Sequence, residues 1–234
     1  MPLSTLRQRS SIPKADYNPS HQPKGADKTW VYPSEQQYYN AIKRKGYKAS
    51  ATDMPSTLAI HNAVNEKGWE MVKEWERERA VGKASPSSLG AGGGSGSSSG
   101  GGEGDDIEIK LLRFTGRPQD MSPKAWINTY LLGYRPPFDR HDWVVKRTDG
   151  TEARYVIDFY AGKVPPGSEI PVAMHLDVRP AIDSFEAVVD RTRIFYTKEV
   201  QPYFSRVLDR FRSDPGSSGP SGEDAPPPPP SLAR

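Results

Sequence analysis

Apolar side chains recur at helical spacing between Pro55 and Arg79, where Gly68 is the only glycine or proline after Pro55. This pattern predicts the longest helix of the N-terminal half. One face of that helix carries, in order, Leu58, His61, Asn65, Trp69, Val72 and either Trp75 or Glu76. We therefore expect His61 to lie on an apolar stripe rather than to face water.

Capping and helix-breaking residues place three further helices. Ser34 and Gln37 form a capping-box pattern, which predicts a helix that runs to about Lys45 and stops at Gly46. Ser122 followed by Pro123 predicts a short helix ending near Leu132. Residues 181 to 199 are typical of a last helix, which ends before a proline at position 202.

Between these helices, runs of β-branched and aromatic residues predict strands at about 107–114, 143–147, 153–160 and 172–178. Asp149-Gly150 lies between the second and third runs and predicts a hairpin turn. We therefore expect an α+β fold, with several helices around a small antiparallel β-sheet in a single domain.

The composition divides the chain further, because its 21 glycines and 23 prolines are clustered. Residues 1–29 are polar and proline-broken, which favours an extended arm with little regular structure. Residues 30–212 should fold, apart from a flexible Gly/Ser-rich insertion at 81–105. Residues 213–234, with five prolines at 226–230, should form a disordered Pro-rich tail.

The absence of cysteine excludes disulfides, zinc–thiolate sites, iron–sulfur clusters and cysteine nucleophiles. Imidazole chemistry must use one of four histidines, at positions 21, 61, 141 and 175. A net charge of +3 is too small to indicate a nucleic-acid partner. No apolar stretch approaches the roughly 20 residues that span a bilayer, and no secretory signal is visible, so we expect a soluble or peripheral protein.

Five sequence blocks occur together: Trp-Val-Tyr-Pro-Ser-Glu-Gln at 30–36, Ile-His-Asn at 60–62 with Asn65-Glu66 following, Pro-Phe-Asp-Arg-His-Asp-Trp at 137–143, Arg-Tyr-Val-Ile-Asp-Phe-Tyr at 154–160, and Leu-Asp-Val-Arg-Pro-Ala at 176–181. In content and order they resemble the signature blocks of the mitochondrial cytochrome c haem lyases, or holocytochrome c synthases. Family members often carry Cys-Pro motifs upstream, which this cysteine-free chain lacks.

The resemblance implies an enzyme, a carbon–sulfur lyase that attaches haem b covalently to apocytochrome c. Two thiols of the partner's Cys-x-x-Cys-His motif add to the haem vinyl groups and form thioethers. The implied partners are haem and apocytochrome c, which is recognised through its N-terminal helix and this motif. The implied location is the mitochondrial intermembrane space, peripherally on the inner membrane. Because the substrate supplies both thiols, the lyase needs no cysteine of its own.

The family's iron ligand lies in the Ile-His-Asn block, so the resemblance makes His61 the axial ligand and a catalytic residue. The spacing alone favours a packed core histidine instead. Asn65 and Glu66 would position the ring or meet the substrate, with Glu66 as a second catalytic candidate, although ordinary helix contacts explain both almost as well. Trp30 and Tyr32 would stack on the porphyrin, although aromatic clusters are more often core.

His141, expected in a charged loop, would bind a haem propionate or tie that loop to the sheet, and the two readings are equally supported. Arg147, Arg154 and Arg179 suit haem carboxylates, but salt bridges with nearby aspartates (Asp158, Asp177 and Asp183) explain two of the three at least as well. His21, in the arm, and His175, on an alternating strand, are not expected to be ligands.

Two other functional classes compete with the lyase. A non-catalytic haem carrier or sensor would share the same pocket and iron ligand but form no covalent bond. A basic scaffold without haem would instead bind membranes or nucleic acid through the cluster Lys43, Arg44, Lys45 and Lys48.

Overall fold

The computed structural model of the chain describes residues 2–16, 19, 22, 28–84, 107–162, 173–202 and 205. The Pro-rich tail expected at 213–234, nearly all of the insertion expected at 81–105, and His21 lie outside these residues. Within them, helices combine with two small antiparallel sheets, which confirms the expected α+β class.

The larger sheet has four antiparallel strands in the order β3-β4-β5-β6. Their bounds are Lys110–Gly116 for β3, Asp139–Lys146 for β4, Glu152–Ala161 for β5 and Met174–Pro180 for β6. The predicted hairpin is β4–β5, with Lys146 opposite Glu152 and Gly150 at a positive φ of 79° in the turn. A register shift between Leu111 and Arg113 interrupts the β3–β4 ladder.

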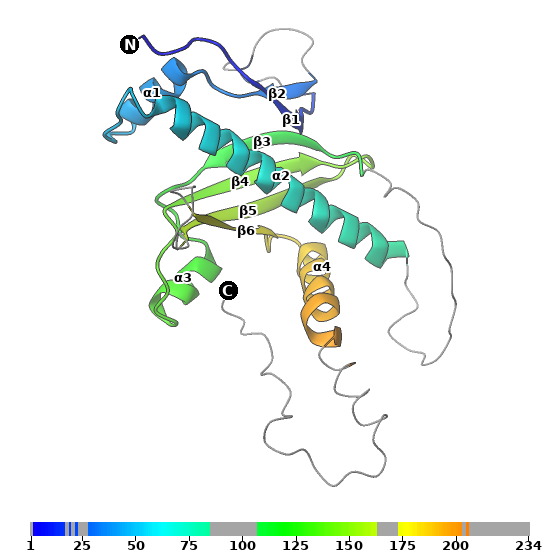
Figure 1. Cartoon of the computed structure of the whole chain (residues 1–234). Helices are drawn as coiled ribbons and strands as arrows, with labels where there is room; N and C mark the ends of the chain where they lie inside the picture. The colour runs from blue at the N-terminus through cyan, green and yellow to red at the C-terminus, as the bar shows by residue number, and fades with distance from the viewer. Residues whose placement is uncertain are drawn as a thin grey trace.

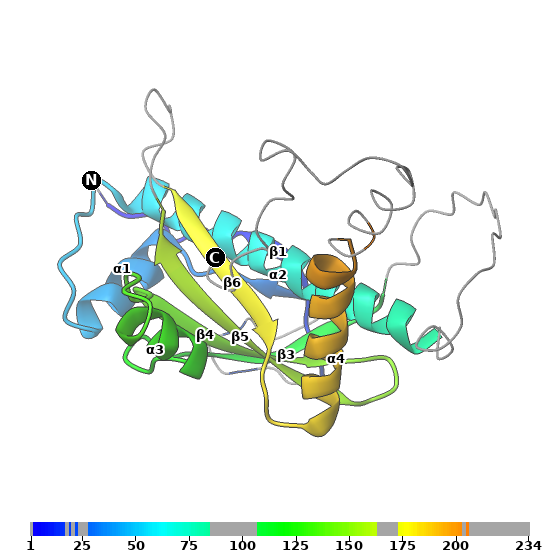
Figure 2. The same cartoon turned by 90° about the horizontal axis from the view of Figure 1, so that it is seen from below.

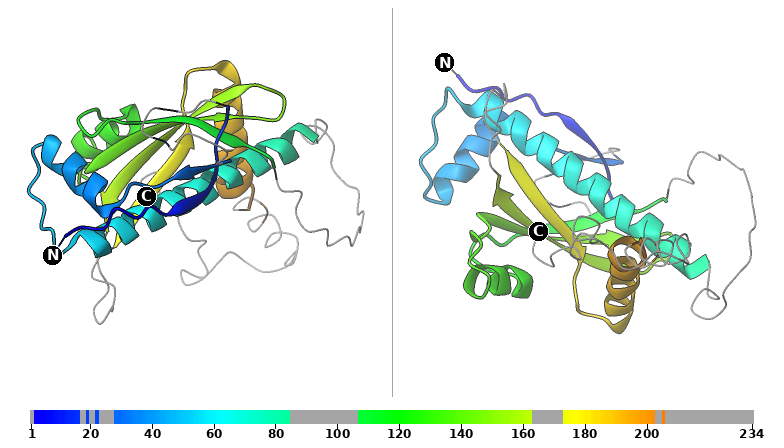
Figure 3. Two further views of the ribbon diagram at one scale, coloured as in Figure 1. Left: turned by 90° about the horizontal axis from the view of Figure 1, so that it is seen from above. Right: turned by 60° about the horizontal axis from the view of Figure 1, so that its bottom comes forward.

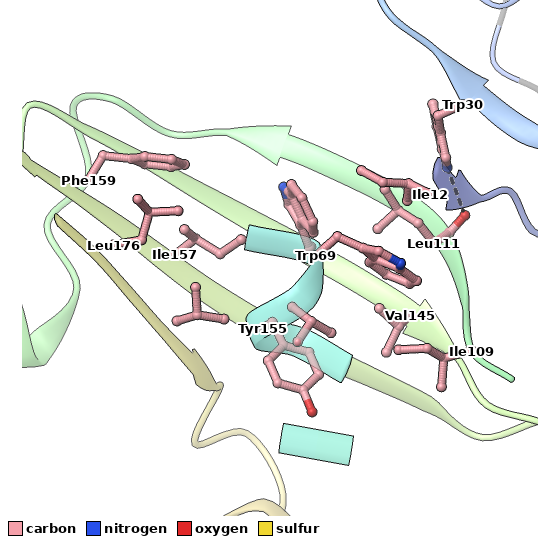
Figure 4. Close-up of a cluster of buried hydrophobic side chains, with 13 residues drawn as sticks. Ile12, Trp30, Trp69, Ile109, Leu111, Val145, Tyr155, Ile157, Phe159 and Leu176 are labelled. Carbon is pink, nitrogen blue, oxygen red and sulfur yellow. Dashed lines mark hydrogen bonds between the residues drawn. The ribbon is translucent and has the colours of Figure 1, made fainter. Parts of the chain in front are cut away.

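Helix α2 (Met54–Ala84) crosses one face of this sheet, as Figure 1 shows. Trp69 and Val72 of α2 pack on the strands, and Gly68 lies over Trp143 and Leu176, where the helix comes close to the sheet. The sheet side of this core is drawn in Figure 4 and includes Leu111, Val145, Tyr155, Ile157, Phe159 and Leu176. The predicted long helix is confirmed, and because it runs to Ala84, residues 81–84 belong to it rather than to the insertion.

The N-terminal residues form the smaller sheet, in which β1 (Arg9–Pro13) pairs with β2 (Thr29–Val31). Figure 3 shows β1 and β2 running beside α2. Ser10 and Ile12 of β1 are buried. The expectation of an arm with little regular structure is therefore wrong for residues 9–13. This segment is ordered by backbone pairing, which a polar, proline-broken composition does not reveal.

Helix α1 (Glu35–Arg44) begins with the predicted capping box of Ser34 and Gln37 and ends before Gly46, which has a φ of 80°. Helix α3 (Pro123–Tyr130) is capped by Ser122, as predicted. Ser122 also donates to Asp158, which alternates with the core residue Ile157 along β5, so α3 begins on the sheet face opposite α2. Figure 2 shows α3 and α4 at opposite ends of the sheet.

Helix α4 (Phe185–Phe195) begins later than the expected Ala181, at the cap residue Ser184, and a π-helical turn, η1 (Tyr196–Val200), continues it. Asp190 of α4 binds Arg79 of α2 at 3.1 Å, which joins the last helix to the longest one. No helix in the described ranges is both long enough and apolar enough to cross a membrane.

Candidate functional site

His61 lies on the N-terminal half of α2, beside α1 and β2. Its ring packs against Tyr38 of α1, with centroids 4.8 Å apart, and lies edge-on to Tyr32 at 6.0 Å. Burial lowers the pKa of His61 below its ordinary value, and the nearby His141 lowers it further, against the opposing effect of the Asn62 hydrogen bond. The imidazole is therefore neutral at neutral pH, which is the form that binds a metal.

The hydrogen bonds of His61 define which ring nitrogen is available. Nδ1 lies 3.1 Å from the side-chain oxygen of Asn62, and because an amide oxygen only accepts, Nδ1 carries the hydrogen. The amide nitrogen of Asn62 donates to the side chain of Gln8 at 2.9 Å, which orients this amide. Nε2 therefore keeps its lone pair and lies 3.3 Å from the amide nitrogen of Asn65, which also donates to the His61 carbonyl at 2.7 Å.

Trp30 and Tyr32, the two aromatic candidates, are buried beside this ring. The indole nitrogen of Trp30 donates to the Leu111 carbonyl at 3.1 Å, and its ring lies edge-on to Phe114 at 5.3 Å. The Tyr32 hydroxyl donates to Glu66 at 2.9 Å, and burial, reinforced by Glu66, raises its pKa. Both rings are therefore fixed in position.

These side chains surround a cavity of about 450 Å³ between α1, α2, β2 and the β3–β4 edge of the larger sheet. The cavity brings together five of the predicted site residues: Trp30, Tyr32, His61, Asn65 and His141. Sequence reasoning missed other lining residues: Arg7, Ile12, Gln37, Asn40, Arg44, Leu111, Phe114 and Trp143. The sequence could have indicated the lining residues of α1, because residues 37, 40, 41 and 44 share one helical face. No sequence pattern pointed to Arg7, because its segment has no periodicity.

Glu66, the second catalytic candidate, does not line the cavity. One of its carboxylate oxygens accepts from the Ser11 backbone at 3.0 Å and from the Tyr32 hydroxyl, and the other accepts from the Ser11 hydroxyl. Glu66 therefore fastens β1 to α2 and holds Tyr32 in place. Its contacts support a positioning role instead of contact with a ligand.

His141 lies on β4, opposite Ile157 of β5, so the expectation of a loop position was wrong. Its Nε2 donates to Asp139 at 3.3 Å, and its ring meets Phe159 edge-on at 4.9 Å. Burial raises the pKa of Asp139, but His141 and the Arg140 backbone N–H outweigh it and leave the pKa below its usual value. The strand thus fixes the imidazole at the cavity wall.

The three arginines proposed for haem carboxylates do not line this cavity. Arg147 forms a two-pronged ion pair with Glu76, at 2.7 and 2.8 Å. Arg154 binds Asp142 at 2.9 Å and Asp183 at 2.8 Å. Arg179 binds Asp158 at 2.6 Å and Asp177 at 2.8 Å. The alternative reading, salt bridges with neighbouring aspartates, therefore describes Arg154 and Arg179. His175 is exposed on β6, away from the cavity.

Comparison with known sequences decides the family. A sequence model of the cytochrome c/c1 heme lyase family matches residues 1–195. The chain belongs to this family. It is 40% identical over 200 residues to the bovine holocytochrome c-type synthase and 44% identical over 194 residues to a putative holocytochrome-c1 synthase of Chaetomium thermophilum. These matches cover 82% and 79% of the chain but only 59% and 61% of the two relatives.

A third heme lyase relative, the holocytochrome-c synthase of Saccharomyces cerevisiae, is 32% identical over 239 residues, covering 93% of the chain and 72% of the yeast protein. No solved structure matches the chain. The described residues contain no cluster of three or more histidine or acidic side chains able to hold a metal ion alone.

Proposed function

We propose that this chain is a holocytochrome c synthase that attaches haem b to the Cys-x-x-Cys-His motif of apocytochrome c. The observation that carries the proposal is that the hydrogen bond from Nδ1 to Asn62 leaves Nε2 of His61 unprotonated at the wall of an aromatic cavity. A neutral imidazole on one side of the iron leaves the other axial position for the substrate histidine.

The bond-forming step adds an S–H across a C=C bond, twice. In each addition a cysteine thiol gives its sulfur to one vinyl carbon and a hydrogen to the other, so the step is neutral in protons and electrons. Reduced thiols are required, and the apocytochrome supplies them. The protein's contribution is to hold the iron through His61, to enclose the macrocycle between aromatic side chains, and to present it to the two cysteines, so that most of the rate gain comes from positioning.

The test must separate a synthase from a non-catalytic haem carrier or sensor, because both would bind haem through His61. Purified protein is mixed with haem, reductant and apocytochrome c, and the product is extracted with acidified acetone. Haem that stays with the apocytochrome polypeptide supports the synthase. Haem that binds the protein but is fully extracted supports the carrier. Apocytochrome with both cysteines replaced by serine is the matched control, and it must yield no covalent haem.

We also propose that the protein acts in the mitochondrial intermembrane space, peripherally on the inner membrane. The family resemblance is the basis for the compartment. The support for membrane contact is an exposed apolar surface on α3 and the loop after it, made of Trp126, Ile127, Tyr130, Leu131, Leu132, Tyr134 and Phe138. Residues 121–138 contain no acidic side chain and two basic ones, of which Lys124 pairs with Asp177 of β6 at 2.8 Å and Arg135 follows the apolar residues of the loop. Tryptophan and tyrosine beside cations suit the headgroup region of an anionic membrane.

A further inference from the structure

The charged side chains that line the His61 cavity are all cationic at neutral pH. Among its lining residues are two arginines, Arg7 and Arg44, and no aspartate or glutamate. The remaining lining is largely apolar and aromatic. Two guanidinium groups at an apolar cavity without carboxylates favour a ligand that has a hydrophobic body and anionic groups.

Arg44 is the last residue of α1 and shares a helical face with Gln37, Asn40 and Ala41, all of which line the cavity. It forms no ion pair with any carboxylate in the described part of the chain. A cation in the last turn of a helix interacts favourably with the helix dipole. This interaction does not depend on which side of the helix the cation lies on. Arg44 is exposed and lines the cavity, so its guanidinium is accessible to an anionic group of a ligand there.

Arg7 reaches the same cavity from the N-terminal segment. Its Nε donates to the Tyr32 carbonyl at 2.8 Å, and one Nη donates to the Val31 carbonyl at 2.9 Å. These two bonds orient the guanidinium. The backbone of β2 and the residue after it thus holds the Arg7 side chain in place at the cavity wall.

We propose that Arg44, together with Arg7, binds the propionate carboxylates of haem. This inference rests on the proposed function and gives the orientation of the bound porphyrin ring. In protoporphyrin IX the propionates and the vinyl groups lie on opposite sides of the ring. Anchoring the propionates near the C-terminal end of α1 therefore turns the vinyl edge away from α1. The cysteines of the apocytochrome must approach from that far side.

The test compares haem with its dimethyl ester, which keeps the iron and the vinyl groups but lacks the carboxylate charges. Both are titrated into wild type and into Arg44→Gln, Arg7→Gln and the double variant, with absorbance as the readout. We expect wild type to prefer haem over the ester. Arg44→Gln should reduce that preference roughly 5-fold, as expected for a partly exposed ion pair, and the double variant roughly 20-fold. Ester binding should not change in any of them.

Lys43→Gln is the matched control, because it removes one positive charge from the same helix at a residue that does not line the cavity. Constant ester affinity also shows that each variant keeps a folded cavity. The inference is overturned if wild type binds both porphyrins equally, if Arg44→Gln weakens both to the same extent, or if Lys43→Gln has the same effect as Arg44→Gln. If wild type binds neither porphyrin, the proposed function fails as well.

Discussion

Two regions of the molecule use arginine in opposite ways. On the larger sheet, Arg147 and Arg179 each meet a carboxylate that is almost completely buried, Glu76 and Asp158 respectively. At the His61 cavity, Arg7 and Arg44 stand at a wall that has no carboxylate. The arginines of the sheet find their carboxylates within the chain, whereas Arg44 at the cavity has no carboxylate partner among the described residues and can meet a ligand. The first region should therefore govern stability, and the second should govern what the protein binds.

The largest expected effect tests the stability side of this comparison. Glu76 is 2% exposed and accepts from Arg147 and from the Tyr155 hydroxyl, at 2.7 Å each. Glu76→Ala leaves both donors buried without their partner, so we expect the free energy of unfolding to fall by about 3–5 kcal/mol in urea titrations. Glu70→Ala is the control on the same helix. Its exposed pair with Lys73 should contribute less than about 0.5 kcal/mol. A Glu76→Ala protein as stable as the Glu70→Ala control would contradict the division of roles.

The next effect tests the binding side. His61→Ala removes the proposed iron ligand, whose imidazole is oriented at the cavity by the hydrogen bond to Asn62. Loss of a residue that only orients a metal ligand can reduce affinity roughly 100-fold, and we expect the loss of haem affinity in His61→Ala to be larger. Covalent attachment of haem should cease. Soret titrations measure the first and acid-acetone extraction the second. His175→Ala, on the exposed side of β6, should bind haem normally. Near-normal haem loading in His61→Ala would refute the ligand assignment.

A smaller effect separates the ligand from the residues that orient it. Asn62→Leu removes the acceptor that fixes the hydrogen on Nδ1 of His61, and we expect haem affinity to fall roughly 10- to 100-fold. Asn62→Asp restores an acceptor and should recover most of the affinity, which a purely structural role for the amide would not explain. Equal haem affinities of the Leu and Asp variants would show that the hydrogen bond from Nδ1 does not affect haem binding.

The smallest effect concerns the α3 surface. Leu131→Ser together with Tyr134→Ser should weaken binding to anionic phospholipid vesicles roughly 5-fold in flotation assays. Phe185→Ser on α4, where the side chain is 83% exposed, is the control and should bind as wild type. Trp126 is 52% exposed, whereas Trp30, Trp69 and Trp143 are buried and Trp75 is partly buried against the core. Brominated lipids should therefore quench the fluorescence of Trp126, and equal quenching in Trp126→Phe would exclude this surface as the contact.

The sequence predicted the elements whose signals are local. Ser34 and Ser122 cap helices where expected, and Gly150 lies in the predicted hairpin turn. The place of His61 on the inner face of α2 also followed from spacing, because one face of a long helix must be buried. Its proposed role as an iron ligand did not follow from spacing and came from the family resemblance of the Ile-His-Asn block.

The sequence was misleading where polar residues are buried. Residues 139–142 read as a charged loop, yet they begin β4, because Arg140 and Asp142 pair with each other on one face of the strand. Periodicity counts apolar side chains and cannot register a strand face made of ion pairs. For the same reason, no pattern separated the paired arginines of the sheet from Arg44 at the cavity. That distinction depends on tertiary neighbours.

The contacts of Leu111 determine the order in which the cavity can be assembled. Its carbonyl accepts from the Trp30 indole, 81 positions earlier, and from the Ala15 backbone at 3.0 Å. A chain that emerges N-terminus first must therefore wait for β3 before its opening segment can dock, and closing so long a loop slows folding. A chain that has not yet reached β3 lacks one wall of the cavity and should retain haem poorly. Loading with haem should accordingly be a late event in the maturation of this protein.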